Sequence, residues 1–388
     1  MFTTAFDKID GKEILRLKEN SIPEDKHIEY KDHINLDQLK DKKEFLADIS
    51  SFANTNGGHI FWGISEESGI ANEINGVDVS SIDELYQKIE AIIRDGLEPR
   101  INYELKFIEL DSGRKVIIAY IYESWNKPHM VTLAGHGKFY ARNNSGKYPL
   151  SVDELKTIII HNQFLADKIR KFRFERIQNL ILGETPIPCD GNGKLVLHII
   201  PHQSFSNPVA KINISKLKDL KFSTLDYRNE FPRDKINIDG FLRYNYWGDH
   251  YNPYVQIYRS GIIECVSDAL LRDNEKIIID PKNFEISIKD NLPNLLEILK
   301  FNGFMPPIYL FLSLLGIQGS VYPMDKYKIK YSDPISRNEL LLSESVISSY
   351  EDNILSVFKQ TFDEIWNALG ILESPNIDNQ GKWNPQRK

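Results

Sequence analysis

Helix-like and strand-like patterns alternate along the first half of the chain. Apolar residues at spacings of three and four predict helices over about 37–54 and 82–94. Alternation of apolar and polar residues, or a short apolar run, predicts a strand. Such patterns occur at 27–31, 59–64, 103–110, 116–122 and 137–142. This mixture predicts an α+β fold for the first half, with a mixed sheet and packed helices.

One long helix near the middle of the chain marks the limit between two predicted domains. Ser151 and Glu154 fit the capping box S-x-x-E, which opens a helix that runs to about residue 182. A Gly/Pro-rich stretch at 183–188 then breaks the pattern. We therefore expect a first domain at 1–182, with lead-in and exit helices, and a second domain at 187–388.

The second half has a mixed pattern without a motif that names a role. Short apolar runs predict strands at 195–200, 254–258 and 277–279. Helices are expected at 292–299, 306–315 and 350–369. These elements favour an α/β-type domain of unknown family for 187–388.

The charge of the chain is unevenly distributed. Lys and Arg total 48 and Asp and Glu total 55, which gives a net charge of −7. Residues 1–100 carry −9, residues 101–182 carry +5 and residues 183–388 carry −3. The total argues against a general DNA coat protein, which shows a basic excess. Contact with nucleic acid is therefore expected to be local.

Several classes of protein are excluded by particular residues. Cys189 and Cys265 lie far apart and form no C-x-x-C pair, which excludes a four-cysteine zinc site and argues against a disulfide framework. The first residues lack the pattern of a secretory signal, and the most apolar stretch, 308–317, is too short to span a bilayer. No Walker A loop is visible. We expect a cytoplasmic protein that does not enter a membrane.

Four charged residues in the first domain are candidates for chemistry. Alternation places Glu29 and Lys31 on one face of the 27–31 strand, Glu24 lies just upstream, and Glu66 follows the buried 59–64 strand. If the two strands are neighbours, three carboxylates and an ammonium converge. Such a set suits Mg²⁺ or Mn²⁺ and hydrolysis of a phosphodiester. The alternative is the solvated face of an ordinary strand.

A basic segment follows the acidic one. The candidate nucleic-acid-binding residues surround the 137–142 strand or lie on the long helix: Lys138, Arg142, Lys147, Arg170, Lys171 and Arg173. Cationic side chains beside an acidic site would hold a phosphate backbone. The alternative is a helix with an ordinary solvated basic face.

Two longer motifs in the first domain point to a known family. EDKHIEYK at 24–31 and SFANTNGGHIFWGI at 51–64 resemble the Schlafen AlbA-2 domain family. Shorter matches are ING at 74–76, EPRI at 98–101 and FYAR at 139–142. The resemblance covers roughly residues 18–160. Without it, the ANTNGG run is explained by a helix cap and the start of a strand, and a phosphate cradle is the alternative.

The resemblance implies a fold and an active site. In Schlafen-type nucleases three acidic residues form a metal-dependent site that cleaves structured RNA, transfer RNA above all. By motif position the first two are Glu24 and Glu29. The third falls in the turn after Gly63 and Ile64, where the family usually has Asp. Glu66 is the expected residue and Glu67 is the alternative.

The sequence therefore leads to a first functional hypothesis and an alternative. The first is a metal-dependent endoribonuclease with Mg²⁺ or Mn²⁺ that cleaves tRNA or other structured RNA, as a defence or toxin effector. The second is a non-catalytic regulatory protein that binds DNA or RNA. Larger Schlafen relatives clamp nucleic acid between two copies of this domain, and a single copy is visible here. The resemblance therefore also implies a homodimer.

Overall fold

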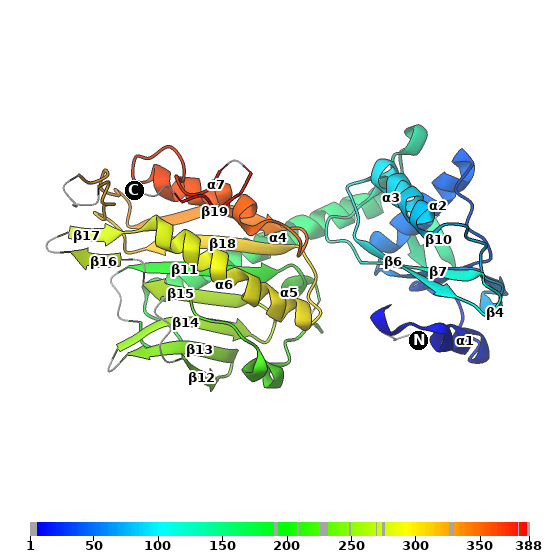
Figure 1. Ribbon diagram of the computed structural model, residues 1–388, viewed down its shortest axis with the longest axis horizontal. Helices are drawn as coiled ribbons and strands as arrows, with labels where there is room; N and C mark the ends of the chain where they lie inside the picture. Colours follow the sequence, from blue (N-terminus) through cyan, green and yellow to red (C-terminus); the bar gives the residue numbers. More distant parts are fainter. Residues whose placement is uncertain are drawn as a thin grey trace. The chain divides into compact units, whose positions relative to one another are not determined.

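The chain folds into two compact units, Met1–Phe164 and Leu165–Lys388, here called unit 1 and unit 2. The computed structural model describes residues 6–189, 193–207, 209–225, 232–247, 250–268, 270–273, 276–325, 330–378 and 380–385. Among these residues no helix is long and apolar enough to cross a membrane. Figure 1 shows the elements with their labels.

Unit 1 is built around a four-stranded sheet in the order β1-β2-β7-β6. Its strands are β1 (Ile28–Lys31), β2 (Gly58–Trp62), β6 (Tyr103–Glu109) and β7 (Lys115–Ile121). β1 runs parallel to β2, and the other pairs are antiparallel. The predicted strands and the mixed sheet are confirmed, and β1 is an edge strand.

Both faces of this sheet are covered by helices at the positions that the apolar spacing predicts. The helices are η1 (Phe6–Lys8), α1 (Gly11–Glu19), α2 (Leu39–Ala53) and α3 (Ile82–Gly96). α2 and α3 pack with Ile60 and Trp62 of β2 on one face. α1 packs with Phe61 on the other. Glu29 and Lys31 are in register with Ile60 and Trp62, so they lie on the α2 side.

A second, smaller sheet in unit 1 has the order β10-β9-β8-β5. Its strands are β5 (Leu97–Glu98), β8 (Met130–Val131), β9 (Lys138–Asn143) and β10 (Gly146–Pro149), with η2 (Leu133–Gly135) between β8 and β9. β9 lies against α2. β3 (Ile64–Glu67) and β4 (Ile70–Ile74) form a separate hairpin. The residues that follow Ile64, where the sequence predicts a turn, are therefore part of β3, and the hairpin turn lies at Ser68 and Gly69.

The link between α2 and β2 depends on two glycines and one asparagine. Asn54 caps α2, and its side chain donates to the carbonyls of His129 and Tyr140 and accepts from the His129 N–H. Gly58 has φ +152°, and a Cβ there would lie 2.3 Å from the His27 carbonyl oxygen. A Cβ at Gly57 would lie 2.6 Å from a backbone nitrogen. These contacts explain the ANTNGG run as a structural turn.

The helix α4 (Val152–Ile181) crosses from unit 1 to unit 2. Its predicted capping box is present, because Ser151 and Glu154 exchange hydrogen bonds through side chain and backbone. The two compact units meet inside this helix, whereas the sequence places the domain limit after it. The reason is that the second half of α4 buries Ile169 and Ile177 against strands of unit 2.

Unit 2 is a seven-stranded antiparallel sheet with helices on both faces. The order is β12-β13-β14-β15-β11-β18-β19. The strands are β11 (Lys194–Pro201), β12 (Pro232–Ile236), β13 (Gly240–Trp247), β14 (His250–Tyr258), β15 (Ile263–Asp268), β18 (Ile308–Leu315) and β19 (Glu339–Ile347). A separate hairpin joins β16 (Leu270–Asp273) to β17 (Lys276–Ile279). Antiparallel pairing together with the packed helices makes unit 2 an α+β domain.

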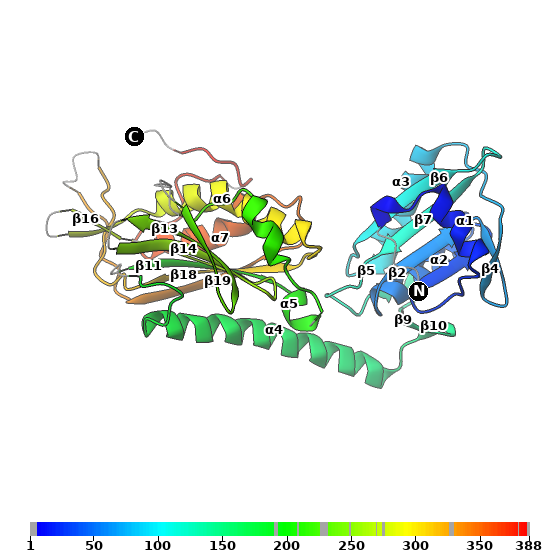
Figure 2. The ribbon, with the colours of Figure 1, turned by 90° about the horizontal axis from the view of Figure 1, so that it is seen from below.

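The helices of unit 2 pack on the sheet as Figure 2 shows, with α6 and α7 on one side and the second half of α4 on the other. They are α5 (Gln203–Ser206), η3 (Ile214–Asp219), α6 (Pro281–Phe301) and α7 (Ile354–Asn367). The helix predicted at 306–315 is wrong. This segment forms β18, whose eight residues are all buried in the sheet, and a short continuous apolar run fits a central strand as well as a helix.

Candidate functional site

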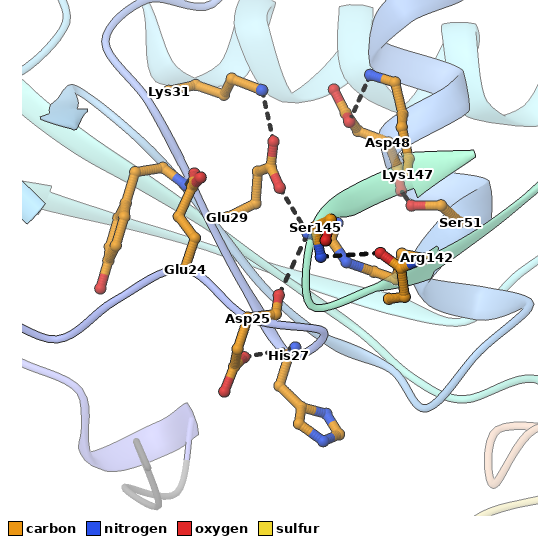
Figure 3. Close-up of polar contacts among 12 residues, drawn as sticks. Glu24, Asp25, His27, Glu29, Lys31, Asp48, Ser51, Arg142, Ser145 and Lys147 are labelled. Atoms are coloured by element: carbon orange, nitrogen blue, oxygen red, sulfur yellow. Dashed lines mark hydrogen bonds and ion pairs between the residues drawn. The ribbon is translucent and has the colours of Figure 1, made fainter. Parts of the chain in front are cut away.

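Glu29 is the centre of a charged group at the edge of the unit 1 sheet. Its Oε1 lies 2.5 Å from the Lys31 ammonium and its Oε2 lies 2.5 Å from Nη2 of Arg142 (Figure 3). Burial opposes ionisation of Glu29, but the charges of Lys31 and Arg142 outweigh it and hold its pKa below the usual range. The predicted neighbours Glu29 and Lys31 therefore lie together.

Arg142 reaches Glu29 from β9 and is itself buried, with a side chain only 1% exposed. Its guanidinium carbon lies 3.7 Å above the centre of the Phe52 ring, and Nη2 also donates to the Asp25 carbonyl at 3.4 Å. Its N–H donates to Thr55 Oγ1. Nη1 and Nε have no hydrogen-bond partner. Arg142 thus holds the ANTNGG turn, β1 and β9 together, with donor capacity left over.

Asp48 of α2 is a carboxylate that the motif search did not select. It is buried, and its Oδ1 lies 2.7 Å from the Lys147 ammonium, which also pairs with Glu44. Burial raises the pKa of Asp48 against the pull of Lys147 and Lys31. A signal was available in the sequence, because Asp48 falls on the apolar stripe of α2, three residues after Phe45.

Glu24 lies beside β1, where the negative charges of the other carboxylates act on it. Its Oε1 accepts the Tyr30 N–H at 2.8 Å. Burial raises the pKa of Glu24, and the negative charges of Glu29 and Glu66 add to the effect, against that hydrogen bond and Lys31. The three predicted acids are therefore near enough to act on one another electrostatically.

Glu66 is on β3, and its side chain is exposed and turned toward its own hairpin. Its Oε2 accepts the Gly69 N–H, while the Gly69 carbonyl accepts the Glu24 N–H at 2.6 Å. The hairpin tip thus lies next to the Glu24 segment, as the motif predicts. Glu67, the alternative third acid, is also exposed.

The acidic set does not fit a metal ion in this arrangement. Both carboxylate oxygens of Glu29 are taken by cations, and an oxygen of Glu66 accepts from its own turn. Across the part of the chain that the structure describes, no group of three or more His, Cys, Asp or Glu side chains could hold a metal ion. In this arrangement Lys31 and Arg142 neutralise the carboxylate of Glu29.

The predicted basic residues are divided between the two units. Lys138, Arg142 and Lys147 belong to unit 1, and the residues on the long helix belong to unit 2. Lys138 is exposed on β9, but Lys147 is engaged by two carboxylates. Arg142 is too deeply buried to meet a phosphate in this arrangement.

The three basic residues of α4 have ordinary partners within unit 2. Arg170 pairs with Glu344 at 3.1 Å, and Lys171 lies 3.6 Å from Glu175. The prediction that Arg173 contacts a phosphate does not fit its position in the structure. It is largely buried, and Nη2 donates to the Leu312 and Leu342 carbonyls and to Ser313 Oγ. Burial lowers the pKa of Arg173 to about 10.

Comparison with known proteins bears on unit 1. The family model "Schlafen, AlbA_2" matches residues 24–151. A structure of the DIP2311 protein from Corynebacterium diphtheriae is 16% identical, with a TM-score of 0.24 over 32% of this chain and 22% of that protein. This chain therefore spans about a fifth of that protein's length.

A second structure is the N-terminal domain of a Nitrosomonas europaea protein described as related to the ATP-dependent DNA helicase RecG. It is 15% identical, with a TM-score of 0.23 over 30% of this chain and 76% of that domain. Neither TM-score supports an argument about fold or function. The matched segment contains Glu24, Glu29 and Arg142, and residues 24–151 of this chain are thus similar to the family "Schlafen, AlbA_2".

Proposed function

We propose that unit 1 binds nucleic acid through its phosphate backbone at the β1 edge of the sheet. The Schlafen AlbA_2 match favours nucleic acid as the partner. The observation that carries the proposal is the row of alternating charges in which Asp48, Lys31, Glu29 and Arg142 follow one another. Such a row holds cations in fixed positions, and fixed cations lose little side-chain freedom when a phosphate binds.

Lys31 is the cation of this row that a phosphate reaches. Its side chain is 36% exposed, against 11% for Glu29 and 1% for Arg142. Burial works against the charged form of Lys31, but Asp48 and Glu29 outweigh it and raise its pKa. The ammonium therefore stays charged at neutral pH while it faces water. Lys138, exposed on β9, is a second contact in this proposal.

The experiment measures affinity against salt. Labelled tRNA and a labelled DNA duplex are titrated with the full chain over a range of salt concentrations, with and without EDTA. Lys31→Met should weaken binding to both and lower the slope of log K against log salt by about one. Lys88→Met is the matched control, because Lys88 is 43% exposed and also pairs with a carboxylate, Asp37, away from the site. Equal slopes for both variants would refute the proposal.

A metal-dependent endoribonuclease that cleaves tRNA or other structured RNA is the second candidate function. The raised pKa of Glu24 favours it, since burial first and the charges of Glu29 and Glu66 second oppose its ionised form, and a cation would offset both. It requires Glu29 to exchange its present partners for the cation. The test incubates tRNA with Mg²⁺ or Mn²⁺. Cleavage that Glu29→Gln abolishes in a folded protein would support it, and unchanged cleavage would exclude the site.

A role in defence or as a toxin, and a homodimer, stay predictions. Light scattering of the full chain at micromolar concentration tests the homodimer, and a monomer would count against it. Growth of cells that express the active chain or the Lys31→Met variant tests toxicity.

A further inference from the structure

Three rings lie together on the face of the unit 1 sheet opposite α2. His59 of β2 is in register with Tyr120 of β7, and their ring centroids are 4.7 Å apart. The Tyr122 ring meets Tyr120 edge-on at 4.6 Å. All three side chains are half-buried, so this ring platform reaches the surface of unit 1. Burial and the neighbouring His27 lower the pKa of His59 to about 4, so its ring is neutral at pH 7.

A flat ring from the start of the chain already covers part of the platform. Phe6 of η1 stacks on Tyr120 with centroids 5.8 Å apart and 26° between the planes. It also stacks on His59, at 6.2 Å and 30°. The platform therefore accepts a planar ring in a near-parallel orientation, which is the geometry in which aromatic side chains stack on bases.

Lys106 of β6 holds the backbone of the same short helix. Its ammonium donates to the Asp7 carbonyl at 2.9 Å and to the Phe6 carbonyl at 3.4 Å. Lys106 is in register with Ile118, so it lies on the same face of the sheet as Tyr120. A lysine that binds two neutral carbonyls gains more from a phosphate, because that contact is charge-assisted.

The helix η1 lies at the surface of unit 1. It has no buried residue, whereas Ile9, which follows directly, is fully buried in the core beside α1. Residues 6–8 therefore belong to the low-stability end of unit 1, with a fixed point at Ile9. They can leave the platform while α1 stays in place.

Phe6 and its neighbouring carbonyls present a planar ring and acceptor oxygens to the sheet. One nucleotide presents the same two kinds of group, in its base and its phosphate. We propose that His59, Tyr120 and Tyr122 form a stacking platform for an unpaired base of single-stranded nucleic acid, which displaces Phe6 and brings a phosphate to Lys106. This inference rests on the proposed function and adds the class of ligand to it. Base stacking on aromatic rings tolerates any sequence, so the site selects unpaired strands and reads no particular base.

The platform is joined to the β1 edge through a short piece of backbone. The His27 carbonyl accepts the His59 N–H at 2.8 Å, and the Asp25 carbonyl accepts Nη2 of Arg142. Residues 25–27 thus border both Arg142 and the rings. Glu104, the acidic side chain at the platform, is engaged by the Tyr122 hydroxyl.

The experiment uses the full chain and a single-stranded oligonucleotide that carries 2-aminopurine, whose fluorescence falls when the base stacks. A duplex of the same sequence is the second arm. Wild type should quench the single strand more than the duplex. Tyr120→Leu should weaken single-strand binding roughly tenfold or more and abolish the quench. Phe6→Ala should strengthen both single-strand binding and the quench, because it removes the competing ring. Tyr86→Leu, an exposed tyrosine on α3, is the matched control.

Each outcome decides the inference. A stronger quench with Phe6→Ala supports it even if Tyr120→Leu does not fold, and Tyr120→Phe should then restore the ring and the quench. Binding of duplex and single strand with the same affinity, unchanged by Phe6→Ala, would overturn the platform and leave the proposed function standing. Failure of both nucleic acids to bind would overturn both proposals.

Discussion

Each unit contains a buried glutamate that an arginine reaches from far along the chain, but the two are held differently. In unit 2, Glu264 accepts Nε and Nη2 of Arg176 at 2.8 and 2.9 Å, and the Tyr254 hydroxyl at 2.9 Å. His198 Nε2 lies 3.0 Å away. In unit 1, Glu29 receives one nitrogen from each of two cations.

The difference separates a structural centre from a candidate ligand site. The carboxylate of Glu264 is fully buried and saturated with donors, and these hold its pKa at about 2 despite the burial. Beside Glu264, Nδ1 of His198 lacks a partner. Near Glu29, two nitrogens of Arg142 lack one, and Glu24 in addition has a raised pKa. Polar groups left unsatisfied in a folded protein are expected where a ligand binds. Four measurements test whether the two centres differ in this way.

The largest effect is expected for Glu264→Gln. It leaves Arg176, mostly buried, without its counter-charge, and loss of one partner of a buried pair costs about 3–5 kcal/mol. Hydrogen exchange of unit 2 peptides in increasing urea measures the loss. Glu351→Gln, at an exposed site, is the control. A loss under about 1 kcal/mol would mean that Glu264 is not the anchor of α4.

Acid should weaken unit 2 through the same residue. The pKa of Glu264 is about 2 in the folded protein against 4.5 ordinarily, so its stabilisation is complete above pH 4.5 and is lost as the pH falls toward 2. The difference corresponds to about 3 kcal/mol. Urea midpoints of unit 2 at neutral pH and near pH 3 test this. Glu264→Gln should lack this part of the pH dependence, and parallel curves would contradict the assignment.

Arg142→Met should destabilise unit 1 less than Glu264→Gln destabilises unit 2. The pair with Glu29 is lost, but Lys31 still neutralises that carboxylate, so we expect about 2–3 kcal/mol. Hydrogen exchange of unit 1 peptides gives the value, with the exposed Arg114→Met as control. A loss as large as that of Glu264→Gln would make the two centres equivalent and remove the contrast.

Glu24→Gln is expected to stabilise unit 1 at neutral pH by about 0.5–1 kcal/mol. The pKa of Glu24 is raised, so its ionised form opposes folding as the pH rises through that pKa. Gln keeps the acceptor for the Tyr30 N–H and removes the charge. The gain should vanish at low pH, where Glu24 is protonated. Destabilisation at neutral pH would show that Glu24 is structural.

The elements of unit 1 could be predicted because local signals and packing agree there. The apolar stripe of α2, the alternation in β1 and the capping box at Ser151 each belong to an element that the structure contains. The segment that forms β18 is wrongly predicted as a helix. Its eight consecutive buried residues show neither the period of a helix nor that of a half-exposed strand. β18 lies between β11 and β19, and this position depends on pairing with strands that are distant in the sequence.

The candidate site could be predicted only in part. Glu29 and Lys31 share a face because a strand has a period of two. The partner of Glu29, Arg142, comes from a different sheet 113 residues away, which no local pattern reveals. The opposite error concerns Arg173, whose charge suggested an exposed face. Its three hydrogen bonds are to residues that are distant in sequence, so burial could not be inferred.

The helix α4 has a consequence for synthesis of the chain on the ribosome. Arg176 finds Glu264 88 residues later, and Arg173 finds the Leu342 carbonyl 169 residues later. Unit 1 is complete in sequence at Phe164, long before those partners exist. A nascent or truncated chain that stops before β11 would expose Ile169 and Ile177 of α4, which makes such chains substrates for chaperones and proteases.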